Sequence, residues 1–390
     1  MKDETLLTHA GRDPAAQHGA VNPPVYHAST VIAPTVEVLK AREAAPFDGM
    51  TYGRTGTPTS FALEETVAAL EGGDRGVAVS SGLAAIVVTL TAFVKAGEHI
   101  LVPDNVYGPT RVRACDGILK RFGVETTYYD PLIGADIVSL IRPNTRIIFL
   151  ESPGSLTFEV QDVPAIAAAA REQGCLTVCD NTWGAGLFFK PLTHGVDITL
   201  QAATKYIVGH SDAMLGVVVT TTAEQFKAVK WTANALGNCV GPDDCYLGLR
   251  GIRTLAARLD RHQRTGLTLA GWLKERPEVT RVMHPALPDD PGHSLWRRDF
   301  TGACGLFGLA LKPVSKDAVA TMLDGMKLFA MGYSWGGYES LCVPTEPARW
   351  RSATEWTEPG PSLRIHAGLE DPDDLIADLE AGFARLNAAA

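Results

Sequence analysis

The chain has 390 residues, of which 46% are hydrophobic and 20% charged, so it is long enough for two domains with substantial cores. Its formal charge of −9 argues against a nucleic-acid partner and against binding to an anionic membrane surface. The longest apolar run, near Leu83–Val94, is too short to span a bilayer, and no signal-peptide pattern opens the chain. We therefore expect a cytoplasmic protein. The seven dispersed cysteines predict free thiols, without a disulfide framework or a metal site.

The first 58 residues show little periodicity and many turn formers. Such a segment rarely packs alone, and we expect an N-terminal arm, residues 1–58, that reaches a neighbouring subunit. Near its end, Tyr52 and Arg54 are two residues apart, so in an extended segment their side chains point the same way. They could together bind a phosphate or a carboxylate. A solvated loop is the alternative interpretation.

From residue 59 to residue 248 the pattern alternates between short apolar runs and helical periodicity. This alternation predicts a largely parallel sheet covered by helices on both faces. The predicted strands are 77–80, 99–104, 124–130, 146–152, 175–180 and 197–204, and the predicted helices are 61–73, 83–97, 107–123 and 163–174.

Five polar residues fall just past the ends of predicted strands, where ligands bind in sheets of this kind. They are Ser81, Tyr107, Glu151, Asp180 and Lys205. The turn at Ser81-Gly82 opens a helix, so its free backbone N–H groups could hold a phosphate. No GxxxxGK[ST] or GxGxxG motif occurs in the chain.

Lys205 ends an apolar run, and Asp180 ends another. A desolvated lysine can condense with an aldehyde cofactor as a Schiff base, although a lysine here could also extend its ammonium group to solvent. A buried aspartate needs a cationic or donor partner, and a protonated heteroaromatic nitrogen would serve. An aspartate that caps a turn is the alternative.

After residue 248 the pattern changes to a smaller α+β domain, residues 249–390. A long amphipathic basic helix is predicted over 250–276, followed by strand candidates at 281–285 and 305–311. A glycine-rich aromatic loop covers 332–340. Arg364 lies in a predicted strand among apolar neighbours, which suits recognition of a carboxylate or a structural ion pair.

Taken together, the motifs resemble those of the pyridoxal-phosphate enzymes of cysteine and methionine metabolism, the cystathionine lyase and synthase family. The motifs are YGR at 52–54, SSG at 80–82, CDN at 179–181, DITLQAATKYIVGHS at 197–211 and RIHAGLED at 364–371. The resemblance implies the aspartate aminotransferase-like fold type I. It implies a pyridoxal-phosphate-binding domain over 59–248 with a mostly parallel seven-stranded sheet, and the smaller C-terminal domain over 249–390.

The resemblance also implies roles for individual residues. Lys205 would carry pyridoxal 5'-phosphate covalently and move the Cα proton, and Asp180 would pair with the ring nitrogen. Many relatives have a serine where this chain has Ala202. Tyr107 would stack on the cofactor ring, and Arg364 with Ser334 would bind the substrate carboxylate. The phosphate would be bound by Ser81, Gly82, Leu83 and Thr204, and by Tyr52 and Arg54 of a neighbouring subunit. Tyr52 and Tyr107 are candidates for an auxiliary acid–base role.

Two positions select among the chemistries of the family. Ser155 and Trp335 stand where γ-lyases and γ-synthases usually have other residues, and both resemble bacterial cystathionine β-lyases. We therefore expect a carbon–sulfur β-lyase that cleaves L-cystathionine to homocysteine, pyruvate and ammonia, with both residues near the substrate, in a homotetramer built as a dimer of dimers. The alternatives are γ-elimination or γ-replacement, cysteine or cystine cleavage, and a catalytically silent binding protein. The range of sulfur amino acids accepted and any racemisation are left open.

Overall fold

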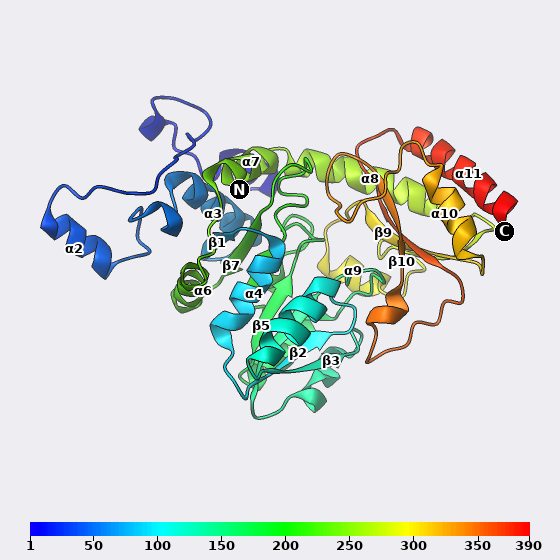
Figure 1. The fold of residues 1–390 in the computed structure, drawn as a ribbon, viewed down its shortest axis with the longest axis horizontal. Helices are drawn as coiled ribbons and strands as arrows, with labels where there is room; N and C mark the ends of the chain where they lie inside the picture. Colours follow the sequence, from blue (N-terminus) through cyan, green and yellow to red (C-terminus); the bar gives the residue numbers. More distant parts are fainter.

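The computed structural model describes residues 1–390 and contains two β-sheets. The larger sheet has seven strands in the order β1-β7-β6-β5-β4-β2-β3 (Figure 1). Its strands are β1 (Arg75–Val79), β2 (His99–Pro103), β3 (Glu125–Tyr129), β4 (Thr145–Glu151), β5 (Leu176–Asp180), β6 (Ile198–Gln201) and β7 (Gly216–Thr220).

Strands β2 to β6 pair in parallel, and β7 is antiparallel to both β1 and β6. The predicted mostly parallel seven-stranded sheet is therefore confirmed. Periodicity alone did not identify β7, because GVVVT is a short, fully buried run between loops. The residues of β2, β5, β6 and β7 are almost all buried, as expected for a sheet with both faces covered.

Helices surround this sheet and their ends follow simple sequence signals. Helix α3 (Pro58–Glu71) begins with a capping box and ends at Gly72 in the left-handed region. Helix α4 (Gly82–Phe93) is capped by Ser81, whose hydroxyl accepts from the Ala84 N–H at 3.1 Å. The others are α5 (Val163–Glu172), α6 (Ala223–Ala235), the π-helix η3 (Thr110–Leu119), and the short 3₁₀ helices η4 (Gly134–Leu140) and η5 (Pro191–His194).

The N-terminal 58 residues contain only short elements: α1 (Asp3–His9), η1 (Ala15–Gln17), α2 (Val36–Ala44) and η2 (Gly53–Thr55). Helix α2 has no buried residue and projects away from the body of the chain (Figure 1). This is the behaviour expected of an arm, and its contact with a neighbouring subunit stays a prediction.

The smaller sheet is antiparallel, with β10 (Leu341–Thr345), β11 (Ser362–His366), β9 (Leu306–Leu311) and β8 (Val279–Met283) in that order. The predicted smaller α+β domain is confirmed. Its helices are α8 (Leu255–Lys274), α9 (His293–Asp299), α10 (Lys316–Asp324) and α11 (Pro372–Ala389), with the 3₁₀ helix η6 (Pro347–Trp350) between β10 and β11.

The prediction of one helix over 250–276 is wrong in one respect, because the structure has two helices in this region. Helix α7 (Pro242–Ile252) ends before Arg253, and α8 begins at Leu255. Thr254 between them has ψ of 8° and is not helical. The Arg253 guanidinium donates to the carbonyls of Leu7 and Ala10 in the N-terminal segment, which favours a turn here. The predicted domain boundary at residue 248 falls inside α7 and stays a prediction.

The fold brings the carboxyl ends of β4, β5 and β6 to one edge of the large sheet. Glu151 at the end of β4 is in register with Asp180 at the end of β5, and Asp180 with Leu200 of β6. The smaller domain reaches this edge through Trp335 of the loop 332–340 and Arg364 of strand β11, which line one cavity together with Glu151 and Asp180. No helix combines the length and apolar character needed to cross a membrane; the expected cytoplasmic location stays a prediction.

Candidate active site

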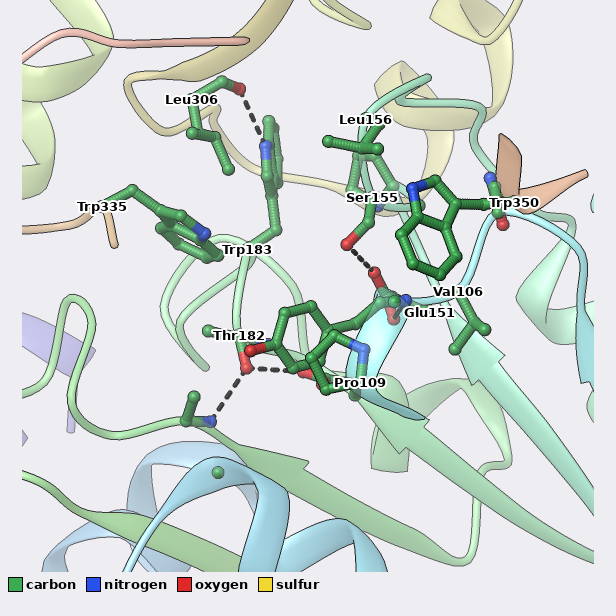
Figure 2. Close-up of a pocket in the computed structure, with 18 of the residues that line it drawn as sticks. Val106, Pro109, Glu151, Ser155, Leu156, Thr182, Trp183, Leu306, Trp335 and Trp350 are labelled. Atoms are coloured by element: carbon green, nitrogen blue, oxygen red, sulfur yellow. Dashed lines mark hydrogen bonds between the residues drawn. The ribbon is translucent and has the colours of Figure 1, made fainter. Parts of the chain in front are cut away.

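A cavity of about 480 Å³ lies at this edge, between the two sheets. Both sheets contribute to its wall, and the indoles of Trp183, Trp335 and Trp350 surround it (Figure 2). Most of the predicted site residues line it: Ser81, Gly82, Leu83, Tyr107, Ser155, Asp180, Thr204, Lys205, Trp335 and Arg364.

Lys205 follows β6 and is held by the loop 332–340 of the small domain. Its Nζ donates to the Ser334 hydroxyl at 2.8 Å and lies 5.3 Å from the centre of the Trp335 ring. Burial, together with the positive charge of Arg364, lowers the pKa of Lys205 to about 8, although Asp180 opposes this. Near physiological pH a minor fraction of this amine is therefore neutral, far more than for an ordinary lysine, and able to act as a nucleophile or base.

The loop can reach Lys205 because one of its residues is glycine. Gly336 has φ of +82°, and a Cβ atom there would lie 3.0 Å from the Lys205 carbonyl carbon. A side chain would therefore be strained and would also collide with the backbone of the lysine. This explains the glycine-rich character of the loop.

Asp180 is 8% exposed and has no ion pair with a protein cation. Its Oδ1 accepts from both the backbone N–H and the hydroxyl of Thr182, so the turn interpretation is part of its role. No protein donor bonds to Oδ2. Burial raises the pKa of Asp180, against the Thr182 bonds and the charge of Lys205. A protonated ring nitrogen would supply the cation that this carboxylate lacks.

The first turn of α4 forms a cradle for an anion. The N–H groups of Gly82 and Leu83 have no acceptor within the helix, as at any helix start, and both residues line the cavity. A Cβ atom on Gly82 would lie 2.4 Å from the Ala202 Cβ, so only glycine allows this approach. The Thr204 hydroxyl donates to the Leu215 carbonyl at 3.1 Å; it would have to leave that bond to donate to a phosphate.

Arg364 on β11 and Tyr107 occupy the same cavity. The Arg364 guanidinium donates to the Ser334 carbonyl at 3.2 Å and has no carboxylate partner, which leaves it available to a substrate carboxylate. Tyr107 is 43% exposed. Partial burial and then the charges of Asp180 and Glu151 raise the pKa of its hydroxyl, against Arg364.

The structure adds Glu151, to which the sequence reasoning gave no role. Its Oε2 accepts from the Tyr107 N–H at 2.8 Å, and its Oε1 shares a hydrogen bond of 2.6 Å with the Ser155 hydroxyl (Figure 2). Burial and then the charge of Asp180 raise its pKa to about 8. Its position directly after a buried strand, in the segment ESPGS, was the available signal.

A network at the rim was also missed. Asp104 is fully buried and accepts from the backbone N–H groups of Ser352 and Thr354 at 2.8 and 2.9 Å. Arg351 pairs with Glu159 at 2.6 Å. These bonds hold the segment after η6, and with it Trp350, against the large domain. No sequence pattern links residues about 250 positions apart.

Tyr52 and Arg54 do not lie in this cavity. They line a separate cavity of about 370 Å³, where Arg54 Nη1 donates to the Asn234 carbonyl at 2.8 Å. One chain therefore does not bring them to its own Lys205. Their predicted role in a neighbouring subunit's site stays a prediction.

The residues present fit pyridoxal phosphate. The cavity offers a lysine with a lowered pKa, a buried carboxylate without a cation partner, and free helix N–H groups beside a glycine that no larger residue could replace. In addition, no group of three or more His, Cys, Asp or Glu side chains is placed to hold a metal ion.

Comparison with known proteins agrees with this geometry. Residues 4–384 match the family model described as Cys/Met metabolism PLP-dependent enzyme. The cystathionine beta-lyase MetC of Escherichia coli is 46% identical, covering 99% of this chain and 99% of that protein. The cystathionine beta-lyase of Salmonella typhimurium is 45% identical, covering 98% of each. The crystal structure of metB from Corynebacterium glutamicum superposes with a TM-score of 0.91 at 33% identity, covering 99% of this chain and 98% of that one.

The chain therefore belongs to the pyridoxal-phosphate-dependent enzymes of cysteine and methionine metabolism. This confirms the family and the cofactor that the motifs indicated.

Proposed function

We propose that the protein is a carbon–sulfur β-lyase that cleaves L-cystathionine to homocysteine, pyruvate and ammonia. The observation that carries this proposal is the full-length similarity, at 45–46% identity, to proteins named cystathionine beta-lyase. The site geometry supports it, because a lysine with a pKa of about 8 stands beside a free arginine in one cavity.

The residues divide into those that hold the substrate and those that hold the cofactor. Arg364 binds the α-carboxylate of the substrate by a paired hydrogen bond. The N–H groups of Gly82 and Leu83 bind the phosphate. Asp180 would hold the proton on the ring nitrogen, and Tyr107 would cover the ring. When bound, the cofactor withdraws electrons from Cα and so stabilises the charge left when the Cα proton departs.

Lys205 moves the protons. Its free amine would remove the Cα proton, and the Ser334 hydroxyl at 2.8 Å would keep Nζ oriented for this step. The bond between the β-carbon and sulfur then breaks with its electron pair leaving on sulfur. Lys205, now an ammonium, would protonate the leaving thiolate, and water would hydrolyse the released aminoacrylate to pyruvate and ammonia. Trp335 and Ser155 wall the region that holds the distal part of the substrate.

A product assay tests this function. The purified enzyme, loaded with pyridoxal phosphate, should release pyruvate and homocysteine from L-cystathionine. Formation of 2-oxobutyrate and cysteine in their place would show γ-elimination and overturn the proposal. A panel of cystine and simple thioethers in the same assay defines the substrate range.

The proposal extends to the assembly. We infer that Tyr52 and Arg54 complete the site of a neighbouring subunit, because they line a cavity that contains neither Lys205 nor Asp180. Arg54→Ala and Lys205→Ala subunits, each inactive as homo-oligomers, should regain part of the activity when exchanged, because one of the mixed sites is intact. Verified subunit exchange without recovery would contradict this. Mass measurement of the native assembly tests the expected tetramer.

A further inference from the structure

Two carboxyl groups lie side by side in the cavity wall. Glu151 and Asp180 end neighbouring parallel strands and are in register. They are 7% and 8% exposed, and neither forms an ion pair with a lysine, arginine or histidine of the chain. Two carboxylates that share a buried site repel each other, so one of them keeps a proton.

The partners of the two groups decide which one is neutral. Asp180 is stabilised as an anion by two bonds from Thr182 and by the charge of Lys205, and in the loaded enzyme it faces the protonated ring nitrogen. Glu151 has only neutral partners, the Tyr107 N–H and the Ser155 hydroxyl, and no cation of its own. The proton therefore belongs on Glu151. This agrees with the direction of its pKa, which burial and Asp180 raise to about 8.

The surrounding charges do not change this assignment. Among the cations that line the cavity, Arg351 pairs with Glu159 at 2.6 Å and Lys205 bonds to Ser334. Of the acids near Glu151, Asp180 is the anion that raises its pKa, whereas Tyr107 and Cys179 are neutral because burial raises their pKa values. The other charged groups that line the cavity are Asp104, Lys205, Arg113, Arg351 and Arg364.

We propose that Glu151 is a neutral carboxylic acid that makes the Ser155 hydroxyl a hydrogen-bond donor toward the cavity. Its Oε2 accepts from the Tyr107 N–H at 2.8 Å, so the proton sits on Oε1, 2.6 Å from the Ser155 Oγ. Glu151 then donates to Ser155, and the Ser155 hydrogen is free for an oxygen of the bound ligand (Figure 2). An ionised Glu151 would take that hydrogen and leave Ser155 with lone pairs only.

This inference rests on the proposed function for its consequence. Ser155 and Tyr107 both line the cavity, so Glu151 positions two groups around the ligand without adding negative charge. A second anion beside Asp180 would raise the pKa of Lys205 and so lower the fraction of neutral amine that can remove the Cα proton. As pH rises through about 8, Glu151 ionises, and kcat/KM should fall.

Infrared difference spectroscopy detects the proton directly. The spectrum of the loaded wild-type enzyme minus that of Glu151→Gln should contain the carbonyl stretch of a protonated carboxyl well below pH 8, and the band should be lost well above it. Absence of the band below pH 8 overturns the proposal. This measurement needs no turnover: with the band present but no pyruvate from cystathionine, the proposed function fails and this inference stands.

Three variants test the effect on catalysis. Glu151→Ala should lower kcat/KM about a hundredfold, because Tyr107 and Ser155 lose their common anchor. Glu151→Gln should restore much of that loss, because its amide oxygen accepts from Tyr107 and its NH₂ donates to Ser155, and its pH profile should lack the fall near 8. In a Ser155→Ala background, Glu151→Gln should change nothing further in the pH profile. A Gln variant as impaired as the Ala variant, or one that keeps the alkaline fall, contradicts the proposal.

Discussion

The substitution Gly82→Ala tests the close contact between α4 and the strand end at Ala202. A Cβ atom at residue 82 would lie 2.4 Å from the Ala202 Cβ and 2.8 Å from its Cα, whereas carbon atoms in contact are about 3.5–4.0 Å apart. The first turn of α4 must therefore shift by about 1 Å, and with it the N–H groups of Gly82 and Leu83. We expect weaker stability and weaker cofactor binding together.

The size of both effects follows from the geometry. Overpacking of a buried contact costs about 1–3 kcal/mol, which urea unfolding of the cofactor-free protein measures. A displaced N–H loses a hydrogen bond to a charged phosphate, worth about 1.5–3 kcal/mol, so cofactor affinity should fall about ten- to hundredfold. Titration of the cofactor-free protein with pyridoxal phosphate, followed by absorbance, gives the second number.

Gly271→Ala is the matched control. Gly271 lies inside α8, and a Cβ atom there would meet no heavy atom within 4 Å. Alanine should therefore stabilise the protein by about 0.5–1 kcal/mol, because it favours the helix, without changing cofactor affinity. A Gly82→Ala protein that unfolds like the wild type and binds cofactor equally well would refute the packing argument. Equal losses in both variants would show a general intolerance of helix substitutions.

Three further predictions concern buried charges. In the cofactor-free protein, pyridoxal phosphate should attach to Lys205 more readily as pH rises through about 8, because the amine is neutral above its lowered pKa. Borohydride reduction traps the attached cofactor for measurement. The Lys205→Arg variant should carry no trapped cofactor on the peptide that contains residue 205. Asp180→Asn should lower kcat on the order of a hundredfold and leave the far-ultraviolet circular dichroism spectrum unchanged. Asp180→Glu should recover part of the lost kcat. An equal kcat in the wild type and the Asp180→Asn variant would exclude an electrostatic role. Lys230→Met removes the ammonium that lies 2.9 Å from the buried Glu64 carboxylate. This should lower the free energy of unfolding, measured in urea, by about 3–5 kcal/mol. A loss below about 1 kcal/mol would mean that the pair is solvated.

Much of the fold could be predicted because the strands of the large sheet other than β7 are short runs between turn signals that alternate with segments of helical periodicity. The same pattern placed Asp180 and Lys205 at strand ends, and the parallel arrangement brought those ends to one edge. The π-helical form of η3 and the break between α7 and α8 could not be predicted, because both depend on packing against segments distant in sequence.

The site was predictable where a residue acts through its own chemical type, and it was not where a residue acts through its neighbours. A lysine after an apolar run, such as Lys205, can be recognised from the sequence as a candidate site residue. The strand-end pattern also placed Glu151 at this edge, but its role could not be predicted, because that role depends on the register beside Asp180 and on the loop that brings Ser155 to it. The rim network of Asp104 likewise depends on a segment about 250 residues later.

The bonds of Ser334 make the carboxylate-binding arginine and the catalytic lysine parts of one unit. Its hydroxyl accepts from Lys205 Nζ at 2.8 Å, and its carbonyl accepts from the Arg364 guanidinium at 3.2 Å. Both bonds depend on the turn at Gly336, whose N–H lies 3.1 Å from His366 Nε2 on the same strand as Arg364. Under the proposed function, a substrate carboxylate on Arg364 would compete with the Ser334 carbonyl for the guanidinium. Ser334 would then couple the carboxylate site to the amine of Lys205, because the same residue bonds to both.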